Sequence, residues 1–181
     1  MGLPTIIGKS KTQVFRFVKE RVWKKLKGWK EKTVSRAGRK VLIKSVAQAI
    51  PSYVMSCFIL HDGLCEEIES MIARFFWGGD ACLHWMSWNK LCRPKLIGGL
   101  GFRNFKHFNL ALVVKNWWRI HTSPETLFVR VFKAVYFSGS SIVEAKRGYR
   151  PSYAWSSILK SKWMFEQGRC WRVGNGTKIR I

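Results

Sequence analysis

Acidic residues are scarce in this 181-residue chain, which has ten Asp and Glu against 33 Lys and Arg and a formal net charge of +23. Its two aspartates, Asp62 and Asp80, are eighteen residues apart, and each lies beside a glycine. Two-metal catalysis on nucleic acid needs carboxylates that hold cations roughly 3.5–4 Å apart. We interpret both aspartates as loop residues that favour turns, and Glu66, Glu67 and Glu69 as first-turn residues favoured by a helix dipole. The chain therefore offers no catalytic residues, and we predict that it is not an enzyme.

Long apolar runs are also missing. The longest, residues 53–60, is much shorter than the roughly 20 residues that span a bilayer. The first residues, MGLPTI, match neither a secretory signal nor a myristoylation motif. We expect an intracellular protein, nuclear or cytoplasmic, that has no membrane partner.

The spacings of cysteine and histidine match no common metal site. Five cysteines form an odd set without short paired spacings, so we expect reduced thiols: Cys57, Cys65, Cys82, Cys92 and Cys170. A tetrahedral zinc site built from four of Cys57, His61, Cys65, Cys82, His84 and Cys92 is an open alternative. Because Cys57 lies in an apolar run, where a free cysteine acts as a small hydrophobic residue, we predict no metal ligand and no cofactor.

The segment GGLGFRN, residues 98–104, raises the question of a phosphate-binding loop. It has neither G-x-G-x-x-G nor G-x-x-x-x-G-K-[ST] spacing, and RPK rather than a hydrophobic strand precedes it. We predict a turn in which glycine permits positive φ or a close backbone approach. Asn104 is then the cap of the following helix, and Arg103 is available to a phosphate.

Helical periodicity dominates the rest of the chain, whose 47% hydrophobic content is sufficient for a core. Apolar residues recur at three- and four-residue spacing after Ser10, at Val14, Val18, Val22, Leu26 and Trp29. Further helices are expected at residues 35–50, ended by Pro51, and at 65–76, 110–120, from Ser123 and at 153–167. A short strand at 84–88 and a hairpin at 170–181 complete a mainly α fold.

The basic residues are concentrated near the N-terminus. The first 50 residues contain fourteen Lys and Arg but two acids, which gives a net charge of +12. Arg36, Lys40 and Lys44 share one helix face at i, i+4, i+8 spacing, with Val34, Val41, Leu42, Val46 and Ile50 on the other side. We interpret Trp29, Trp117 and Trp118 as core residues rather than stacking platforms. A surface this poor in acids favours an anionic partner, either nucleic acid or an anionic membrane surface.

Seven segments carry a family resemblance: GLPTIIGKSK, WKKLKGWKEKTVSRAGRKVLIKSVAQAIPSYVMSCF, a WGG turn, HWMSWNKLCRPKLIGGLGFRNFKHFNLALVVKNWW, FKAVYF, PSYAWSSIL and WRVGNGTKIRI. In this order they resemble the C-terminal part of plant LINE-type (non-LTR) retrotransposon reverse transcriptases. The resemblance implies the thumb and connector between the polymerase palm and a zinc-binding region. It implies a basic, thumb-like helical bundle at residues 1–80. Residues 81–181 then form a helical connector with the GGLGF turn and a short C-terminal β-hairpin.

The residues and the resemblance together predict a non-catalytic reverse transcriptase fragment that binds RNA or an RNA–DNA duplex non-specifically through phosphates, and that has no small-molecule substrate. The expected contacts are Lys24, Lys25, Lys27, Lys30, Arg36, Arg39, Lys40 and Lys44. The alternative is a decayed transposon-derived reading frame with no selected biochemical activity, whose charge is inherited from a larger enzyme.

Overall fold

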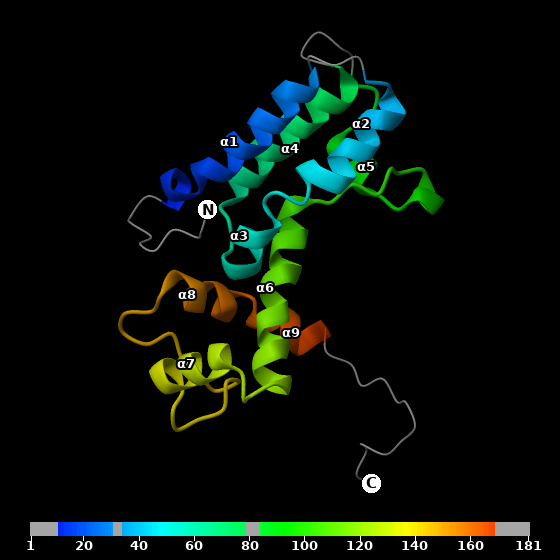
Figure 1. The fold of residues 1–181 in the computed structure, drawn as a ribbon. Coiled ribbons are helices and arrows are strands. Elements are labelled where there is room, and N and C mark those ends of the chain that lie inside the picture. Colours follow the sequence, from blue (N-terminus) through cyan, green and yellow to red (C-terminus); the bar gives the residue numbers. More distant parts are fainter. Residues whose placement is uncertain (1–10, 31–33, 79–83, 169–181) are drawn as a thin grey trace.

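The computed structural model describes residues 11–30, 34–78 and 84–168, and every regular element in these ranges is a helix. The first group comprises α1 (Lys11–Lys30), α2 (Arg36–Leu42), η1 (Ile43–Ala47), α3 (Ser52–Cys57), α4 (Asp62–Trp77), α5 (Trp88–Cys92) and η2 (Lys95–Ile97). The long helix α6 (Phe105–Thr122) leads to α7 (Leu127–Tyr136), α8 (Tyr153–Lys160) and α9 (Lys162–Gly168), as Figure 1 shows. The predicted mainly α fold is confirmed for these residues, and the predicted hairpin lies outside them.

The helices α1 and α4 run side by side in the same direction. Lys19 in the middle of α1 pairs with Glu67 in the first half of α4 at 2.6 Å, and near the ends of both helices the rings of Trp29 and Phe75 lie 5.9 Å apart. The predicted apolar stripe of α1 is confirmed: Val18, Val22 and Leu26 are buried, and Val14 and Trp29 are partly buried against the same core. Ser10, which precedes this stripe, lies outside the described residues.

The predicted helix at 35–50 is divided. Ser35 caps it as expected, since its Oγ accepts a hydrogen bond from Gly38 N at 3.2 Å. The α-helix ends at Leu42, however, and continues as the π-helix η1, in which Gln48 N donates to Ile43 O five residues back. Placing Val41 on the apolar side was therefore wrong, because it is 63% exposed while Ile43 in the wider turn is buried.

The helix α4 begins three residues earlier than predicted. His61 caps it, with Nδ1 accepting a hydrogen bond from Gly63 N at 3.1 Å. Asp62 is thus a first-turn helix residue, and its interpretation as a loop residue was wrong. The interpretation of Glu66, Glu67 and Glu69 as first-turn residues was also wrong, because the earlier start places them beyond the first turn. The predicted stop is confirmed, because Gly78 ends the helix in the left-handed region at φ 105°.

Two other predictions along the chain were wrong. Residues 84–87 form no strand: Trp85 is 70% exposed, while Trp88 starts α5 and stacks on Phe102 with 5.3 Å between ring centroids. The period-two pattern of this stretch therefore reflects a partly buried Trp88 and an exposed Trp85 rather than a strand. Ser123 does not open α7 but closes α6, since its N–H donates to Arg119 O at 3.0 Å, and Thr126 holds the cap position of α7.

The C-terminal helices also differ from the prediction. The single helix expected at 153–167 is broken at Ser161, a buried residue whose hydroxyl donates to Ile158 O at 2.7 Å and competes with the helical bonding pattern. Trp117 is fully buried and donates through Nε1 to Ile158 O at 2.5 Å, as befits a core residue. Assigning Trp118 to the core was wrong, because it is 53% exposed.

Asn109 ties α6 to the end of α3. This buried residue accepts a hydrogen bond from Leu60 N at 2.7 Å through Oδ1. Its Nδ2 donates to Met55 O and to Phe58 O, both at 2.8 Å. The backbone groups where α3 ends have no helical partner of their own, so one side chain satisfies three of them.

Neighbouring side chains complete this connection. Asn116 on α6 donates to Ser56 O at 2.8 Å, and Ser157 on α8 accepts from Ile59 N at 3.1 Å. Tyr153, also on α8, donates to Ile59 O. The segment between α3 and α4 is therefore held by polar side chains from two helices that follow it by about fifty to a hundred residues.

The buried apolar residues form two clusters that α6 connects. Phe105, at the start of α6, belongs to the cluster built by α1, η1, α3 and α4. Val113, Trp117 and Ile120 belong to a second cluster with α7, α8 and α9. The predicted division between residues 80 and 81 stays a prediction.

Replacing Asn109 tests this connection. Asn109→Ala leaves three buried backbone groups without their partner, and each such group costs about 1–3 kcal/mol. We expect the free energy of unfolding to fall by about 3 kcal/mol or more in urea denaturation. The exposed Asn89→Ala serves as the control and should change it by less than about 0.5 kcal/mol. An equal, small effect of both variants would contradict the structure of this connection.

Candidate nucleic-acid interface

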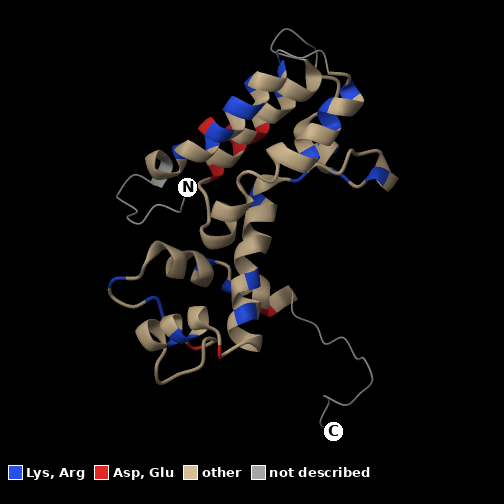
Figure 2. Cartoon of the chain, in the orientation of Figure 1, with Lys and Arg blue, Asp and Glu red and all other residues tan. Residues whose placement is uncertain are grey.

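Lys and Arg are prominent on α1, α2 and the segment that follows α5, while several acids lie where α1 faces α4 (Figure 2). The eight residues predicted to contact phosphates are all exposed or half-buried. None of the eight forms an ion pair with another described residue, whereas Arg16 and Lys19 on the same helix α1 are paired with Glu20 and Glu67.

Four cations, from α2, from η1 and from the two sides of the glycine-rich turn, are close enough for Lys44 to feel the charge of the other three. Lys40 and Lys44 come from α2 and η1, and Lys95 and Arg103 from either side of the turn. Partial burial, followed by the charges of Lys95, Lys40 and Arg103, lowers the pKa of Lys44 below its ordinary value of 10.5. We refer to Lys40, Lys44, Lys95 and Arg103 as the basic cluster. Positive charges gathered in this way form a favourable site for an anion.

The turn itself has the predicted geometry. Gly98 and Gly101 have φ values of 83° and 65°, in the region that favours glycine. A Cβ at Gly99 would lie 1.9 Å from the carbonyl oxygen of Arg93, so the backbone passes where no side chain fits. A Cβ at Gly101 would lie 3.2 Å from Nζ of Lys44, which shows how closely the turn approaches η1.

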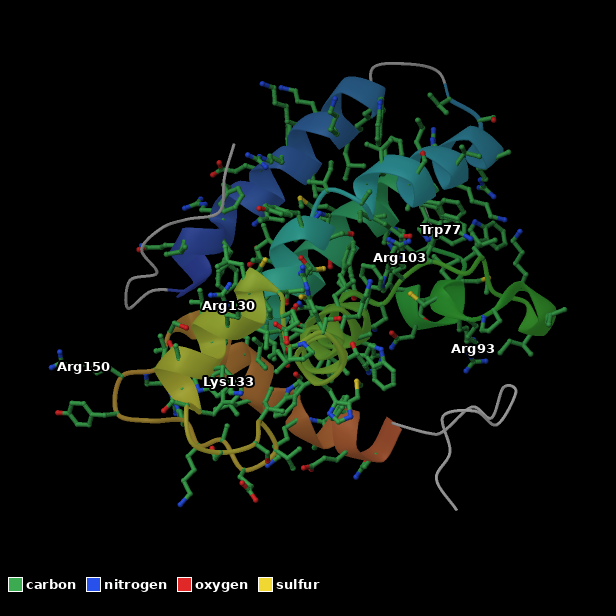
Figure 3. All side chains as sticks on the ribbon, turned by 60° about the horizontal axis from the view of Figure 1, so that its bottom comes forward. Trp77, Arg93, Arg103, Arg130, Lys133 and Arg150 are labelled. Atoms are coloured by element: carbon green, nitrogen blue, oxygen red, sulfur yellow. The ribbon has the colours of Figure 1, made fainter. Side chains whose placement is uncertain are left out.

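The residues after the turn fix Arg103. Phe102 is buried against Trp88, and Asn104 caps α6 as predicted, with Oδ1 accepting from His107 N at 3.1 Å. Between them, the Arg103 guanidinium lies over the Phe108 ring at 4.4 Å from its centroid. Figure 3 labels Arg103 on this segment and Arg93 before the turn, at the end of α5. Sequence reasoning missed Lys95, because only the fold brings it to Lys44.

Three other predicted contacts meet where α1 and α4 end. Lys27 and Lys30 on α1 and Arg39 on α2 line one pocket. Arg39 donates to Phe76 O at 3.4 Å, and the neighbouring Arg36 lies 5.6 Å from the centroid of the Trp77 ring.

Lys24 and Lys25 lie neither in the basic cluster nor among the residues where α1 and α4 end. Both are exposed on α1. At 3.6 residues per turn, Lys24 points away from α4, and Lys25 lies on the opposite flank of α1 from Lys27 and Lys30. The eight predicted residues therefore divide between the basic cluster, the end of α1 and α4, and the outer side of α1.

The few carboxylates have structural partners. Glu69 Oε1 accepts a hydrogen bond from Phe105 N at 2.6 Å at the start of α6, and burial is the main reason that its pKa is raised. Asp62 pairs with Lys106 at 2.7 Å, and this hydrogen bond lowers the pKa of Asp62. These contacts assign both acids to the packing of α4 against α6.

No group of three or more His, Cys, Asp or Glu residues in the described ranges is arranged to hold a metal ion. Of the zinc ligands considered, Cys65 is buried, which raises the pKa of its thiol to about 12, and Cys92 likewise has its pKa raised to about 12 by burial. His61 uses Nδ1 to cap α4. Cys82 lies outside the described residues.

Comparison with known proteins gives two relatives. Over 139 residues the chain is 39% identical to an uncharacterized mitochondrial protein of Arabidopsis thaliana, and the alignment covers 74% of this chain and 89% of that protein. The two proteins belong to one family. A longer Arabidopsis thaliana relative, named "Putative ribonuclease H protein", is 32% identical over 187 residues. The alignment covers 99% of this family member but spans 30% of the longer relative.

No family model and no solved structure matches this member of the family. A search of its described residues finds no helix with the length and apolar character needed to cross a membrane. The expected nuclear or cytoplasmic location stays a prediction, and the name of the shorter relative places that protein in mitochondria.

Replacing Gly99 tests the turn. Gly99→Ala forces a Cβ against the Arg93 carbonyl oxygen, so we expect a loss of more than about 2 kcal/mol in the free energy of unfolding. Gly139→Ala is the matched control, because nothing lies within 4 Å of its added Cβ and its φ is not positive. Urea denaturation of both variants measures the difference, and equal stability would contradict this backbone path.

Lys44 tests the electrostatics of the basic cluster. A lysine whose pKa is lowered by folding costs stability wherever it is charged, so the cost is present at neutral pH and disappears as pH rises from the lowered pKa past 10.5. Lys44→Met keeps the apolar stem, and we expect it to raise Tm at neutral pH and low salt. The gain should shrink at high salt. A lower Tm than the wild type would refute this interpretation, and Lys115→Met on exposed α6 surface serves as the control.

Proposed function

We propose that the chain is a non-catalytic segment that binds duplex RNA or an RNA–DNA duplex through its phosphates. The observation that carries this proposal is the basic cluster, in which four cations from separate segments meet without an ion-pair partner among the described residues. Folding such a cluster costs electrostatic free energy, and a bound phosphate backbone offsets that cost by releasing counterions from the nucleic acid.

The surroundings of the cluster support phosphate contact over an ordinary solvated surface. Where α1 faces α4 the charges have mixed signs and form the pair between Lys19 and Glu67. In the basic cluster, by contrast, Arg103 lies over an aromatic ring, and Gly101 approaches Lys44 closely. Cations held in this way contact the phosphate backbone of a duplex and do not distinguish one base from another. Binding is therefore expected to be independent of sequence.

The resemblance to LINE-type reverse transcriptases suggests in which kind of enzyme this binding takes place. We propose that the chain corresponds to the thumb and connector of such an enzyme, which hold the template and primer behind the polymerase site. The longer relative, of which this chain spans 30%, bears the name of a nucleic-acid enzyme, and this name is consistent with a duplex-holding segment. We place the protein inside the cell, with mitochondria added to the nucleus and cytoplasm as compartments to examine.

The experiment is a salt titration of binding to a labelled RNA–DNA duplex. The test variant combines Lys40→Gln and Lys44→Gln, which removes two charges from the basic cluster. We expect its affinity to fall about tenfold near 0.1 M salt, and the slope of log affinity against log salt to fall by about two, one unit per phosphate contact.

The matched control combines Lys115→Gln and Lys133→Gln, which removes the same charge from exposed positions on α6 and α7. Figure 3 shows Lys133 on α7, in the other half of the molecule. The control should bind almost as tightly as the wild type. If both double variants weaken binding equally, binding depends only on the total charge of the chain and not on the basic cluster. A transposon-derived chain with no selected activity then becomes the better description.

A further inference from the structure

A pocket of about 450 Å³ lies between the C-terminal ends of α1 and α4, which are adjacent in Figure 1. Its walls combine aromatic side chains, Trp23, Trp29 and Phe75, with the basic side chains Lys27, Lys30, Arg39 and Arg74. No carboxylate is found among its described lining residues. The volume is within the range of about 300–1,000 Å³ that is typical of small-ligand sites.

The two tryptophans of the pocket differ in how firmly the core holds them. Trp29 is half-buried and packs at a tilt on Phe75, with 5.9 Å between the ring centroids, so the core holds it in place. Trp23 is 48% exposed, and Nζ of Lys27 lies 5.3 Å from its ring centroid. An exposed indole with a cation over its ring suits a planar ring that carries a negative charge nearby.

The helix dipole explains part of this arrangement. It favours cations in the last turn of α1, where Lys27 and Lys30 lie. It does not explain a large exposed ring at Trp23, nor the presence of Arg39, which comes from another helix and is fixed by its hydrogen bond to Phe76 O. The convergence of these groups is therefore a separate feature of the fold.

We propose that this pocket takes up one unpaired nucleotide next to the bound duplex. Its base lies against Trp23, and its phosphate lies among Lys27, Lys30 and Arg39. This inference rests on the proposed binding of nucleic acid and adds a single-stranded contact to it. Stacking on an aromatic ring accepts every base, so the contact is as independent of sequence as the phosphate contacts.

The test compares three RNA–DNA duplexes of equal length: blunt, with a one-nucleotide overhang, and with an abasic overhang that keeps the phosphate. We expect the base-bearing overhang to bind the full chain about tenfold more tightly than the abasic one, a value within the range of base–aromatic stacking. Trp23→Ala should remove this difference. Trp163→Ala, which deletes an equally exposed tryptophan (51%) from α9, should keep it.

Equal affinity of the wild type for base-bearing and abasic overhangs overturns the inference, as does loss of the difference in Trp163→Ala. Failure of the blunt duplex to bind would instead contradict the proposed function. A free nucleotide has the same chemistry, so AMP is added as a competitor. Millimolar AMP that abolishes the overhang advantage would assign the pocket to free nucleotides and overturn its assignment to a strand.

A second measurement needs no variant. An overhang that carries 5-iodouridine is bound to the wild-type chain and irradiated, and the crosslinked peptide is identified by mass spectrometry. Crosslinking to Trp23 or Trp29 supports the inference, and crosslinking confined to other residues overturns it.

Discussion

The amide of Asn109 is the contact on which the arrangement of the two helix groups depends. It satisfies one N–H and two carbonyl groups where α3 ends, and it does so from the second turn of α6. The chain that leaves α3 enters α4 directly, and α4 is the partner of α1. The direction of α6 relative to the basic surface is therefore set by buried hydrogen bonds, which have stricter geometry than apolar contacts.

A second constraint is electrostatic. The chain has ten acids, and several of those described serve helix packing. Glu69 on α4 accepts a hydrogen bond from Phe105 N at the start of α6, and Glu67 pairs with Lys19. Little negative charge is left to neutralise the basic cluster, so Lys44 is held in its charged state at a cost. Sites that bind ligands commonly give up folding stability in this way. The proposed nucleic-acid surface would therefore be most stable when its partner is bound.

Local chemistry made much of this fold predictable. The apolar stripe of α1, the caps at Ser35 and Asn104, the stop at Gly78 and the glycine turn all depend on residues within a few positions of one another. The sequence-based predictions failed where contacts between residues that are not close in the sequence determine the local structure. The strand expected at 84–88 depended on an alternation that only the packing of Trp88 explains, and the break at Ser161 depends on a buried hydroxyl. Lys95 joins Lys44 only through the path of the turn.

The π-helix η1 has a consequence for how this surface tolerates change. A π turn holds one more residue than an α turn, so the segment from Ile43 to Ala47 behaves as a helix with a single-residue insertion. Deletion of one residue there would restore α-helical hydrogen bonding, while the side chains before and after the segment would keep their relative orientation. Lys40 and Lys44 lie on either side of the start of this segment. A one-codon deletion between Ser45 and Ala47 would therefore leave both lysines on the same side of the helix.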